Sequence, residues 1–173
     1  MDGSELQLVT QARRGDGAAF GQLAALHWDR LVRLARSVAG EAAAEDAVQE
    51  GMVAAWRKLH TLQHAEAFPA WLTRIVFRQS LRLNRGRHGT TALIEGSTDP
   101  ATSGDPDAGI WAAQLLGTLP PRQRAVLHLT VVEGRTDSEI AAQLGINPSS
   151  VRAHRRRARK KLGRLIEKDE EAR

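Results

Sequence analysis

Apolar residues recur at helical spacing through most of the 173-residue chain, and no window alternates apolar and polar positions as a β-strand would. Ser4 and Gln7 have the spacing of a capping box for a first short helix that ends at Gly15. Asp16 can cap a second helix, which Gly40 terminates. The apolar positions of this second helix are Phe20, Leu23, Leu31, Leu34, Ala35 and Val38. The pattern predicts an all-α fold.

A third helix is predicted over residues 42–59, and it has two distinct faces. Its apolar face contains Val48, Met52, Ala55, Trp56 and Leu59. A neighbouring face carries acids and an amide: Glu45, Asp46, Gln49 and Glu50. Most surface helices have a polar face, so a solvated surface is the simplest interpretation of these four residues. A carboxylate metal site is disfavoured, because no histidine or acid at ligand spacing completes the set.

Residues 68–87 combine an apolar face with a stripe of arginines. Pro69 suits the first helical position. The predicted core face contains Leu72, Ile75, Val76, Gln79 and Leu83. The stripe follows Trp71 in steps of four, four and three residues: Arg74, Arg78, Arg82 and Arg85. This spacing lets one helix lay guanidinium groups along a phosphate backbone, and the tryptophan ring can stack on an unpaired base. A solvated arginine face with Trp71 in the core is the alternative.

Residues 89–109 have the composition of a linker. They contain four acids and no lysine or arginine, and they are rich in Gly, Ser, Thr and Pro. Basic segments stand on both sides of this acidic stretch. We therefore expect two small helical domains, residues 1–88 and 109–168, joined by a flexible acidic linker over residues 89–108.

The second domain has the punctuation of a helix-turn-helix unit. A helix beginning at Pro120 and Pro121 presents Ala125, Val126, Leu129 and Val132 and ends at Gly134. Thr136 and Glu139 form a capping box for a short helix over residues 137–144. Gly145 ends that helix, Asn147 can cap the next, and Pro148 takes its first position. A short helix, a turn with glycine and a long helix are typical of this motif.

The long second helix of this unit is strongly basic. Eight Arg or Lys residues lie between Arg152 and Arg164, and the run contains no acid. Val151, Ala158 and Leu162 form the apolar seam that holds the helix in place. The first turns, where a recognition helix reaches base edges and phosphates, contain Ser149, Ser150, Arg152, Ala153, Arg156 and Arg157. We interpret this helix as a DNA-reading element rather than a solvated charge run.

Composition supports an acidic partner and excludes several chemistries. The formal net charge is +5 and the isoelectric point is near 10.6, which favours nucleic acid. The absence of cysteine excludes disulfides, thiolate zinc sites and cysteine nucleophiles. The N-terminus lacks the apolar core of a signal peptide, and no apolar run is long enough to span a membrane, so we expect a cytoplasmic protein.

Three motifs in order resemble one family, the bacterial RNA polymerase sigma factors of the extracytoplasmic-function group. AEDAVQEGMVAAW (residues 44–56) is similar to its core-binding stretch, and FPAWLTRI (residues 68–75) to its −10 recognition and melting segment. LPPRQRAVLHL (residues 119–129) and the helix-turn-helix after it resemble its −35 domain. The resemblance implies sigma regions 2 and 4 and a promoter-directed initiation factor with no enzymatic activity, cofactor or metal.

The resemblance also assigns roles to the residues named above. Glu45, Asp46, Gln49 and Glu50 would contact the β′ clamp helices of core RNA polymerase, and region 4 would contact the β flap. The recognition helix would read the −35 element. The −10 element would meet the loop over residues 61–68 and the helix after it, through His64, Phe68, Trp71, Arg74, Arg78, Arg82 and Arg85. A free monomer is expected, and family members are often held by an anti-sigma factor.

Four positions depart from the family pattern. Arg78 stands where Asn is usual and Arg82 where Asp is usual, so −10 base preference is not transferable from relatives. Ala43 replaces an acid, and Arg155 replaces a Leu or Ile of the recognition helix.

Two other functions compete with the sigma interpretation. A dimeric helix-turn-helix regulator with an N-terminal sensor explains the second half of the chain but not the arginine stripe beside Trp71. A small nuclease would need clustered carboxylates, whereas Asp137 and Glu139 suit the first turn of their helix.

Overall fold

The computed structural model describes residues 2–87 and 106–171, and the chain is helical through both stretches. The linker predicted over residues 89–108 falls mostly on residues 88–105, outside the described residues, and α5 already begins at Pro106. Eight α-helices lie within these residues: α1 (Gly3–Arg13), α2 (Gly17–Ala39), α3 (Glu41–Lys58), α4 (Phe68–Arg87), α5 (Pro106–Gly117), α6 (Pro121–Leu127), α7 (Asp137–Leu144) and α8 (Pro148–Glu171).

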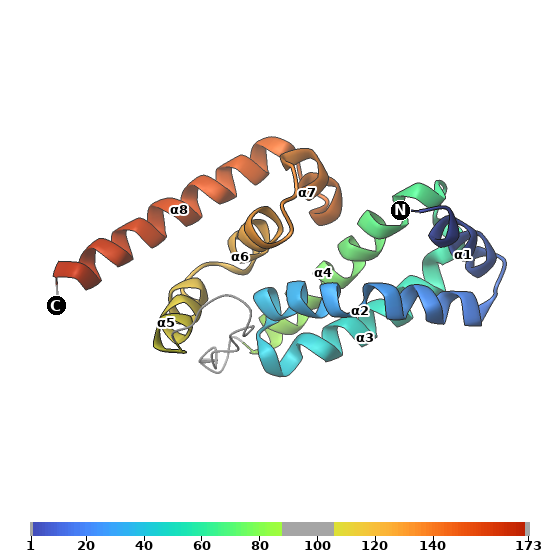
Figure 1. Cartoon of the computed structure of the whole chain (residues 1–173), viewed down its shortest axis with the longest axis horizontal. Coiled ribbons are helices and arrows are strands. Elements are labelled where there is room, and N and C mark those ends of the chain that lie inside the picture. Colours follow the sequence, from blue (N-terminus) through green and yellow to red (C-terminus); the bar gives the residue numbers. More distant parts are fainter. Residues whose placement is uncertain (1, 88–105, 172–173) are drawn as a thin grey trace.

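The N-terminal region is a bundle in which α2, α3 and α4 lie side by side and α1 packs across one end (Figure 1). Its core is built from small and branched side chains, as the low aromatic content requires. Leu23, Leu31, Val48, Leu72 and Val76 are completely buried in it. Two short 3₁₀ turns, Leu59–Thr61 and Ala65–Ala67, connect α3 to α4.

The caps of the first two helices follow from local chemistry, with one correction. The Asp16 carboxylate accepts hydrogen bonds from the backbone N–H groups of Ala18 and Ala19 at 2.9 and 3.0 Å, as predicted. The predicted Ser4–Gln7 capping box is wrong. Asp2 caps α1 by accepting from the Glu5 N–H at 2.8 Å, and the Ser4 hydroxyl donates to Asp2 instead. An ionised carboxylate two residues earlier thus takes the capping role.

Two residues assigned to apolar helix faces are substantially exposed. Trp56 lies at the rim of the bundle, 38% exposed, with its ring 5.1 Å from that of Phe20. Val132 is 63% exposed because α6 continues as a π-helical turn, His128–Val132. A π turn has more residues per turn than an α-helix, so the angular positions shift. Leu129 stays buried while Val132 leaves the apolar face.

The C-terminal region consists of α5 to α8, with α6 packed between α8 and the N-terminal bundle (Figure 1). Helix α8 continues past its contacts with α6 and α7 toward α5, which it also contacts, and its last turns lie away from the N-terminal bundle (Figure 1). Val151 and Ala158 are its buried anchors. Helix α5 precedes this unit, and the sequence pattern did not predict it.

The two regions do not behave as separate bodies, because they share a second apolar core. Leu34 and Val38 of α2 and Phe77 of α4 are buried together with side chains from α6, the π turn, α7 and α8. Helix α7 lies against α4, and α6 lies against α2. The prediction of two helical regions is confirmed, and the structure adds that they dock on each other.

Arg124 fastens this interface from the C-terminal side. Its guanidinium donates to the backbone carbonyls of Ser37 and Val38, at 2.6 and 2.8 Å, in the last turn of α2. It also donates to the carbonyls of Gly117 and Leu119 at 3.2 and 2.7 Å. The last carbonyls of a helix lack intrahelical partners and carry the negative end of its dipole, so a buried cation is well placed there. Burial lowers the pKa of Arg124.

A buried carboxylate forms the second polar contact between the regions. Glu133, whose side chain is 8% exposed, lies 3.3 Å from Arg30 of α2, 3.4 Å from Arg135 and 3.7 Å from His128. Arg30 also donates to the Thr73 hydroxyl at 2.8 Å. Burial alone would raise the pKa of Glu133, but His128 and the two guanidinium groups hold it below its usual range. Removing one partner of such a buried pair is more costly than its net contribution suggests.

The buried His27–Glu5 pair predicts a pH dependence of stability. Burial lowers the pKa of His27, although its hydrogen bond to Glu5 at 3.0 Å opposes the shift. Below about pH 6.5 the unfolded chain therefore binds a proton that the folded chain does not. Stability is expected to fall as the pH drops below that value. Urea midpoints at pH 7.5 and pH 5.5 would measure this, and a midpoint difference unchanged in His27→Gln would contradict it.

Candidate polymerase and promoter interfaces

The helix-turn-helix has the local geometry that the sequence predicted. The Thr136 hydroxyl accepts from the Glu139 N–H, and the Glu139 carboxylate accepts from the Thr136 N–H at 2.8 Å, which completes the capping box. Gly145 ends α7 with φ at 67°, a left-handed conformation that suits glycine. The Asn147 carbonyl accepts from the N–H groups of Ser150 and Val151, which starts α8.

The residues predicted to read DNA lie on the outer face of α8. Ser149, Arg152, Arg156 and Arg157 are exposed, and Ser150 and Ala153 are half-buried. A shallow hollow on this face is lined by Ser149, Arg152, Ala153, Arg155, Arg156 and Arg159. The guanidinium groups of the arginines surround the small side chain of Ala153, which leaves room for a base edge or a phosphate to approach the helix. The arrangement fits a helix that enters a major groove, and the assignment itself stays a prediction.

Arg155, which departs from the family pattern, has a partner that sequence reasoning missed. Its guanidinium forms a two-pronged contact with the Asp137 carboxylate of α7, at 2.5 and 3.2 Å. Both side chains are 23% exposed. Paired N–H···O bonds of this kind are among the stronger polar contacts in proteins. A charged contact therefore joins the two helices at the position where the family resemblance led us to expect Leu or Ile.

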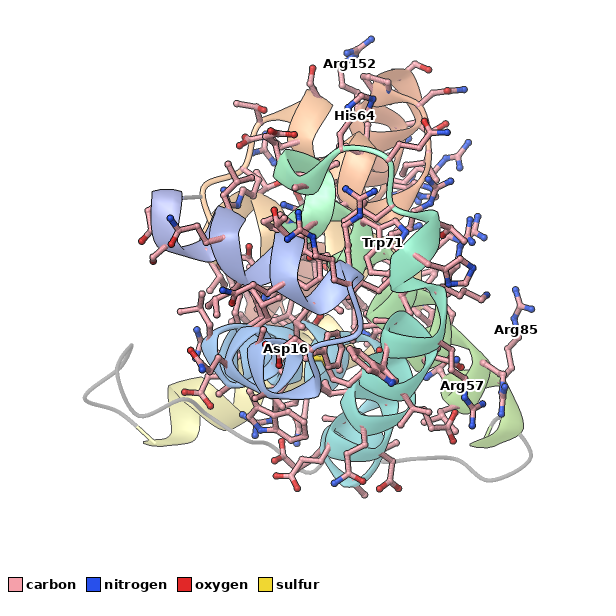
Figure 2. All side chains as sticks on the ribbon, turned by 90° about the vertical axis from the view of Figure 1, so that its right-hand side faces the viewer. Asp16, Arg57, His64, Trp71, Arg85 and Arg152 are labelled. Atoms are coloured by element: carbon pink, nitrogen blue, oxygen red, sulfur yellow. The ribbon has the colours of Figure 1, made fainter. Side chains whose placement is uncertain are left out.

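The arginine stripe on α4 is exposed as predicted. The side chains of Arg74, Arg78, Arg82 and Arg85 are all accessible, and Trp71 at the head of the stripe is half-buried. Figure 2 shows Arg85 reaching outward on the side of the molecule that also carries Arg57. The stripe can therefore meet a phosphate backbone, and Trp71 retains part of its ring for a base.

Phe68 requires a correction, because it is completely buried and cannot touch DNA in this arrangement. Its ring packs 6.1 Å from that of Trp71 and 5.8 Å from that of His27. Phe68 therefore supports Trp71 from below and fixes the start of α4. His64, in the loop before it, is exposed and is visible in Figure 2.

The acidic face of α3 is a real surface feature. Glu45, Asp46 and Gln49 are exposed, and Glu50 is half-buried with its carboxylate 3.6 Å from Arg82 of α4. A shallow hollow between α3 and α4 is lined by Gln49, Glu50, Val53, Ala54, Arg57, Gln79 and Arg82. No group of three metal-binding side chains gathers anywhere in residues 2–87 and 106–171.

Val53 belongs to this face and was missed from the sequence. It is 50% exposed, one turn after Gln49, so it adds an apolar contact to a charged surface. The sequence feature that could have identified it is its position outside the apolar face of α3. Interfaces combine apolar centres with polar rims in this manner.

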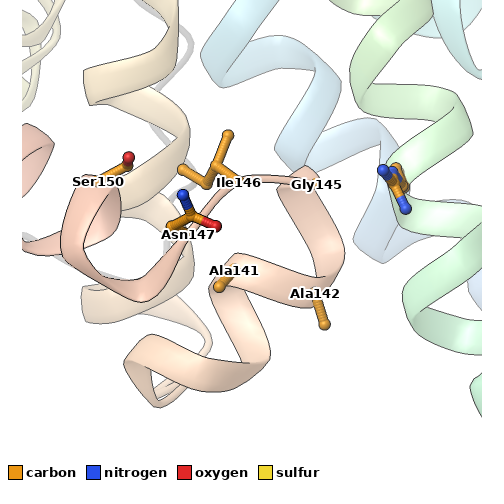
Figure 3. A pocket seen from close by; sticks show the side chains of 7 residues that line it. Ala141, Ala142, Gly145, Ile146, Asn147 and Ser150 are labelled. Atoms are coloured by element: carbon orange, nitrogen blue, oxygen red, sulfur yellow. The ribbon is translucent and has the colours of Figure 1, made fainter.

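The two elements predicted to face DNA meet in this structure. Arg74 of α4 lies over the turn of the helix-turn-helix, where a Cβ on Gly145 would overlap its guanidinium, with Cζ and Nη2 at 2.9 Å. Figure 3 shows the hollow at this junction, lined by Arg74, Ala141, Ala142, Gly145, Ile146, Asn147 and Ser150. One arginine of the stripe is thus engaged by the other region.

Comparison with known families defines the class of protein. The model of Sigma-70 region 2 matches residues 23–89, and the model of Sigma-70 region 4 matches residues 110–162. These ranges contain the acidic face, the arginine stripe and the helix-turn-helix.

Two similar proteins identify the group of sigma factors to which the chain belongs. The chain is 34% identical to the RNA polymerase sigma factor CnrH of Cupriavidus metallidurans over 95% of both chains. It is 32% identical to the ECF RNA polymerase sigma factor SigM of Mycobacterium tuberculosis, over 94% of this chain and 85% of that one. The chain belongs to the extracytoplasmic-function RNA polymerase sigma factors, which direct promoter-specific transcription initiation.

A solved structure agrees with the fold. The structure of CnrH in complex with the cytosolic domain of CnrY superposes with a TM-score of 0.72 at 32% identity, over 96% of this chain and 99% of that one. The alternative of a conventional helix-turn-helix regulator is not favoured, because the N-terminal half matches sigma region 2. Within the described residues, no helix is long and apolar enough to cross a membrane.

Proposed function

We propose that this sigma factor divides its work among three surfaces on three helices. Glu45, Asp46, Gln49 and Glu50 on α3 bind the β′ clamp helices of core RNA polymerase, with Val53 as an apolar contact at their edge. The observation that carries this assignment is an exposed acidic face beside an exposed arginine stripe on the neighbouring helix. Region 4 adds a contact with the β flap.

Helix α4 and the loop before it melt the promoter. Extracting one base from a duplex costs a few kcal/mol of stacking and pairing. A half-buried Trp71 can stack on an extracted base, and the stripe from Arg74 to Arg85 can follow the displaced strand. Helix α8 reads the −35 element. Binding free energy alone drives these steps, and no covalent chemistry is required.

The docked arrangement of the two regions must open for this work. Promoter elements centred at −35 and −10 lie more than two turns of duplex apart, on the order of 70 Å or more. Helices α4 and α7 are in contact in this structure, and Arg74 covers the turn before α8. One conformation therefore cannot place α4 at −10 and α8 at −35. We assign the docked form to the free monomer, and polymerase binding separates the regions.

An anti-sigma factor would favour the docked form. The CnrH structure that superposes over nearly the whole of this chain holds the cytosolic domain of a second protein, CnrY. Since a single superposition spans both regions, the docked arrangement fits a state that such a partner stabilises. A cytoplasmic location follows from the site of transcription.

Run-off transcription with purified core polymerase tests the proposed function directly. Start sites should appear on a promoter library only when the protein is added, and they should share two motifs at a fixed spacing. A protein that shifts duplex DNA as a dimer without supporting initiation would contradict the proposal.

Charge reversal on α3 is expected to weaken assembly with the polymerase. Changing both Glu45 and Asp46 to lysine should lower the affinity for core polymerase at least about tenfold, because like charges then face each other across the interface. Transcription should recover when the variant is added in excess, since its DNA-binding helices are intact. Asp29→Lys, a single charge reversal at an exposed acid on α2, is the control for charge reversal away from this face. A defect that excess protein does not relieve would place these acids in another step.

A further inference from the structure

One carboxylate contacts two arginines of the recognition helix. Asp137, the first residue of α7, accepts from both terminal guanidinium nitrogens of Arg155, Nη1 and Nη2, at 2.5 and 3.2 Å. Its Oδ2 also lies 3.8 Å from Nη1 of Arg152, one turn earlier on α8. Arg152 is far more accessible than Arg155, with 60% of its side chain exposed against 23%.

The cap of α7 does not account for Asp137. Thr136 and Glu139 make the capping box between themselves, and the Asp137 carboxylate points across to α8 instead. Arg155 and Arg152 both line the hollow on the DNA-facing side of α8. The carboxylate therefore acts on side chains that border the surface where DNA would lie.

We propose that Asp137 determines the sequence discrimination of the −35 helix, by withholding Arg155 from phosphates and by restraining Arg152 over the groove. This inference rests on the proposed role of α8. A free arginine on this face would bind any phosphate and would add a sequence-independent term to the affinity. With both prongs of its guanidinium bound to Asp137, Arg155 does not contribute that term.

The Asp137 carboxylate also restricts the orientation of the Arg152 side chain. An arginine reads guanine through two parallel hydrogen bonds, and one such contact changes affinity roughly five- to a hundredfold between right and wrong bases. A side chain already biased toward one geometry loses less freedom on binding. The contact at 3.8 Å limits the movement of Arg152 and leaves its fork accessible.

The test uses the full chain assembled with core RNA polymerase, because the regions of the free chain are docked, and two duplexes, one carrying the −35 motif selected in transcription and one with that motif scrambled. Binding is measured by fluorescence anisotropy over a series of salt concentrations. Asp137→Asn should bind the scrambled duplex several-fold more tightly, and its salt slope should steepen by about one. The ratio of affinities for the two duplexes should fall about tenfold.

Two further variants distinguish an effect of Asp137 on DNA discrimination from an effect on the stability of the fold. Arg155→Met in the Asp137→Asn background should return the salt slope to that of the parent, because the released arginine is gone. Glu167→Gln, an exposed acid on the same helix, makes the same change in net charge and should leave the ratio unchanged.

Equal weakening on both duplexes, with an unchanged slope and a lower melting temperature, would overturn the proposal and make Asp137 a structural brace. A parent protein that does not distinguish the two duplexes would instead overturn the role of α8 itself. The two failures are thus separable.

Discussion

Linking Arg30 and Glu133 positions covalently is expected to abolish initiation. The chain has no cysteine, so Arg30→Cys with Glu133→Cys introduces the only two thiols. The native side chains meet at 3.3 Å across the two regions. The native Arg and Glu side chains together span too great a distance for a direct disulfide between two cysteines. A short bis-thiosulfonate reagent can bridge them, because it forms one disulfide with each cysteine thiolate and releases a sulfinate at each end, which leaves a reducible link. Promoter-dependent transcription should drop on the order of a hundredfold, because only one DNA-binding element can then engage at a time.

Reduction of the linker should restore activity in the same sample. The unlinked double variant lacks the Glu133–Arg30 contact, so it should open at least as readily as the parent. Cysteines at Arg36 and Glu41, an ion pair within the N-terminal region, provide the matched control, and their linkage should leave transcription unchanged. Full activity of the Arg30–Glu133 linked chain would show that the docked arrangement is compatible with initiation, and the proposed opening would be wrong.

Local features of this fold were predictable because their causes lie within a few residues. The Asp16 cap and the Thr136–Glu139 box join groups two or three positions apart, and the left-handed Gly145 depends only on glycine at that position. The exposure of the arginine stripe follows from helical periodicity. The order of three motifs was enough to identify the family.

Docking of the two regions was not predictable, because it depends on pairs far apart in the chain. Arg124 and Val38 are 86 residues apart, and Arg30 and Glu133 are 103 apart. A buried leucine such as Leu34 has the same pattern whether it faces its own bundle or another region. The π turn after α6 was not predictable either, because its residues belong to an apolar run that looks like a continuing α-helix. In the structure this turn moves Val132 off the predicted apolar face.

For the candidate-site residues too, exposure could be predicted from the sequence, whereas contacts with residues distant in the chain could not. The exposure of polar residues such as Asp46 and Arg156 could be predicted from their helix faces alone, whereas the polymerase role proposed for Asp46 came from the family resemblance. The roles of Phe68 and Arg155 depended on partners, since one ring is buried between His27 and Trp71 and the other side chain is held by Asp137.

Gly51→Leu is expected to destabilise the N-terminal region severely, because α3 and α4 approach closely at this residue. A Cβ on Gly51 would lie 2.6 Å from Cγ2 of Val76 and 3.1 Å from its Cα. The second atom belongs to the backbone of α4, so a rotamer change in Val76 cannot make room for a leucine side chain. Overpacking by a few methylene groups costs about 1–3 kcal/mol, and a backbone clash adds to that. The loss is large against a total stability of about 5–15 kcal/mol.

Gly21→Leu makes the same substitution where the outcome should have the opposite sign. Gly21 lies inside α2, and a Cβ there meets no atom within 4 Å. Leucine favours a helix over glycine by nearly 1 kcal/mol, so this variant should be slightly more stable than the parent. Urea unfolding followed by circular dichroism compares the two. Val76→Ala should rescue part of the loss in the milder Gly51→Ala variant, since it removes the nearest atom. Equal stability of the two leucine variants would mean that α3 and α4 do not approach closely at Gly51, and the acidic face would then lack the support that fixes its position.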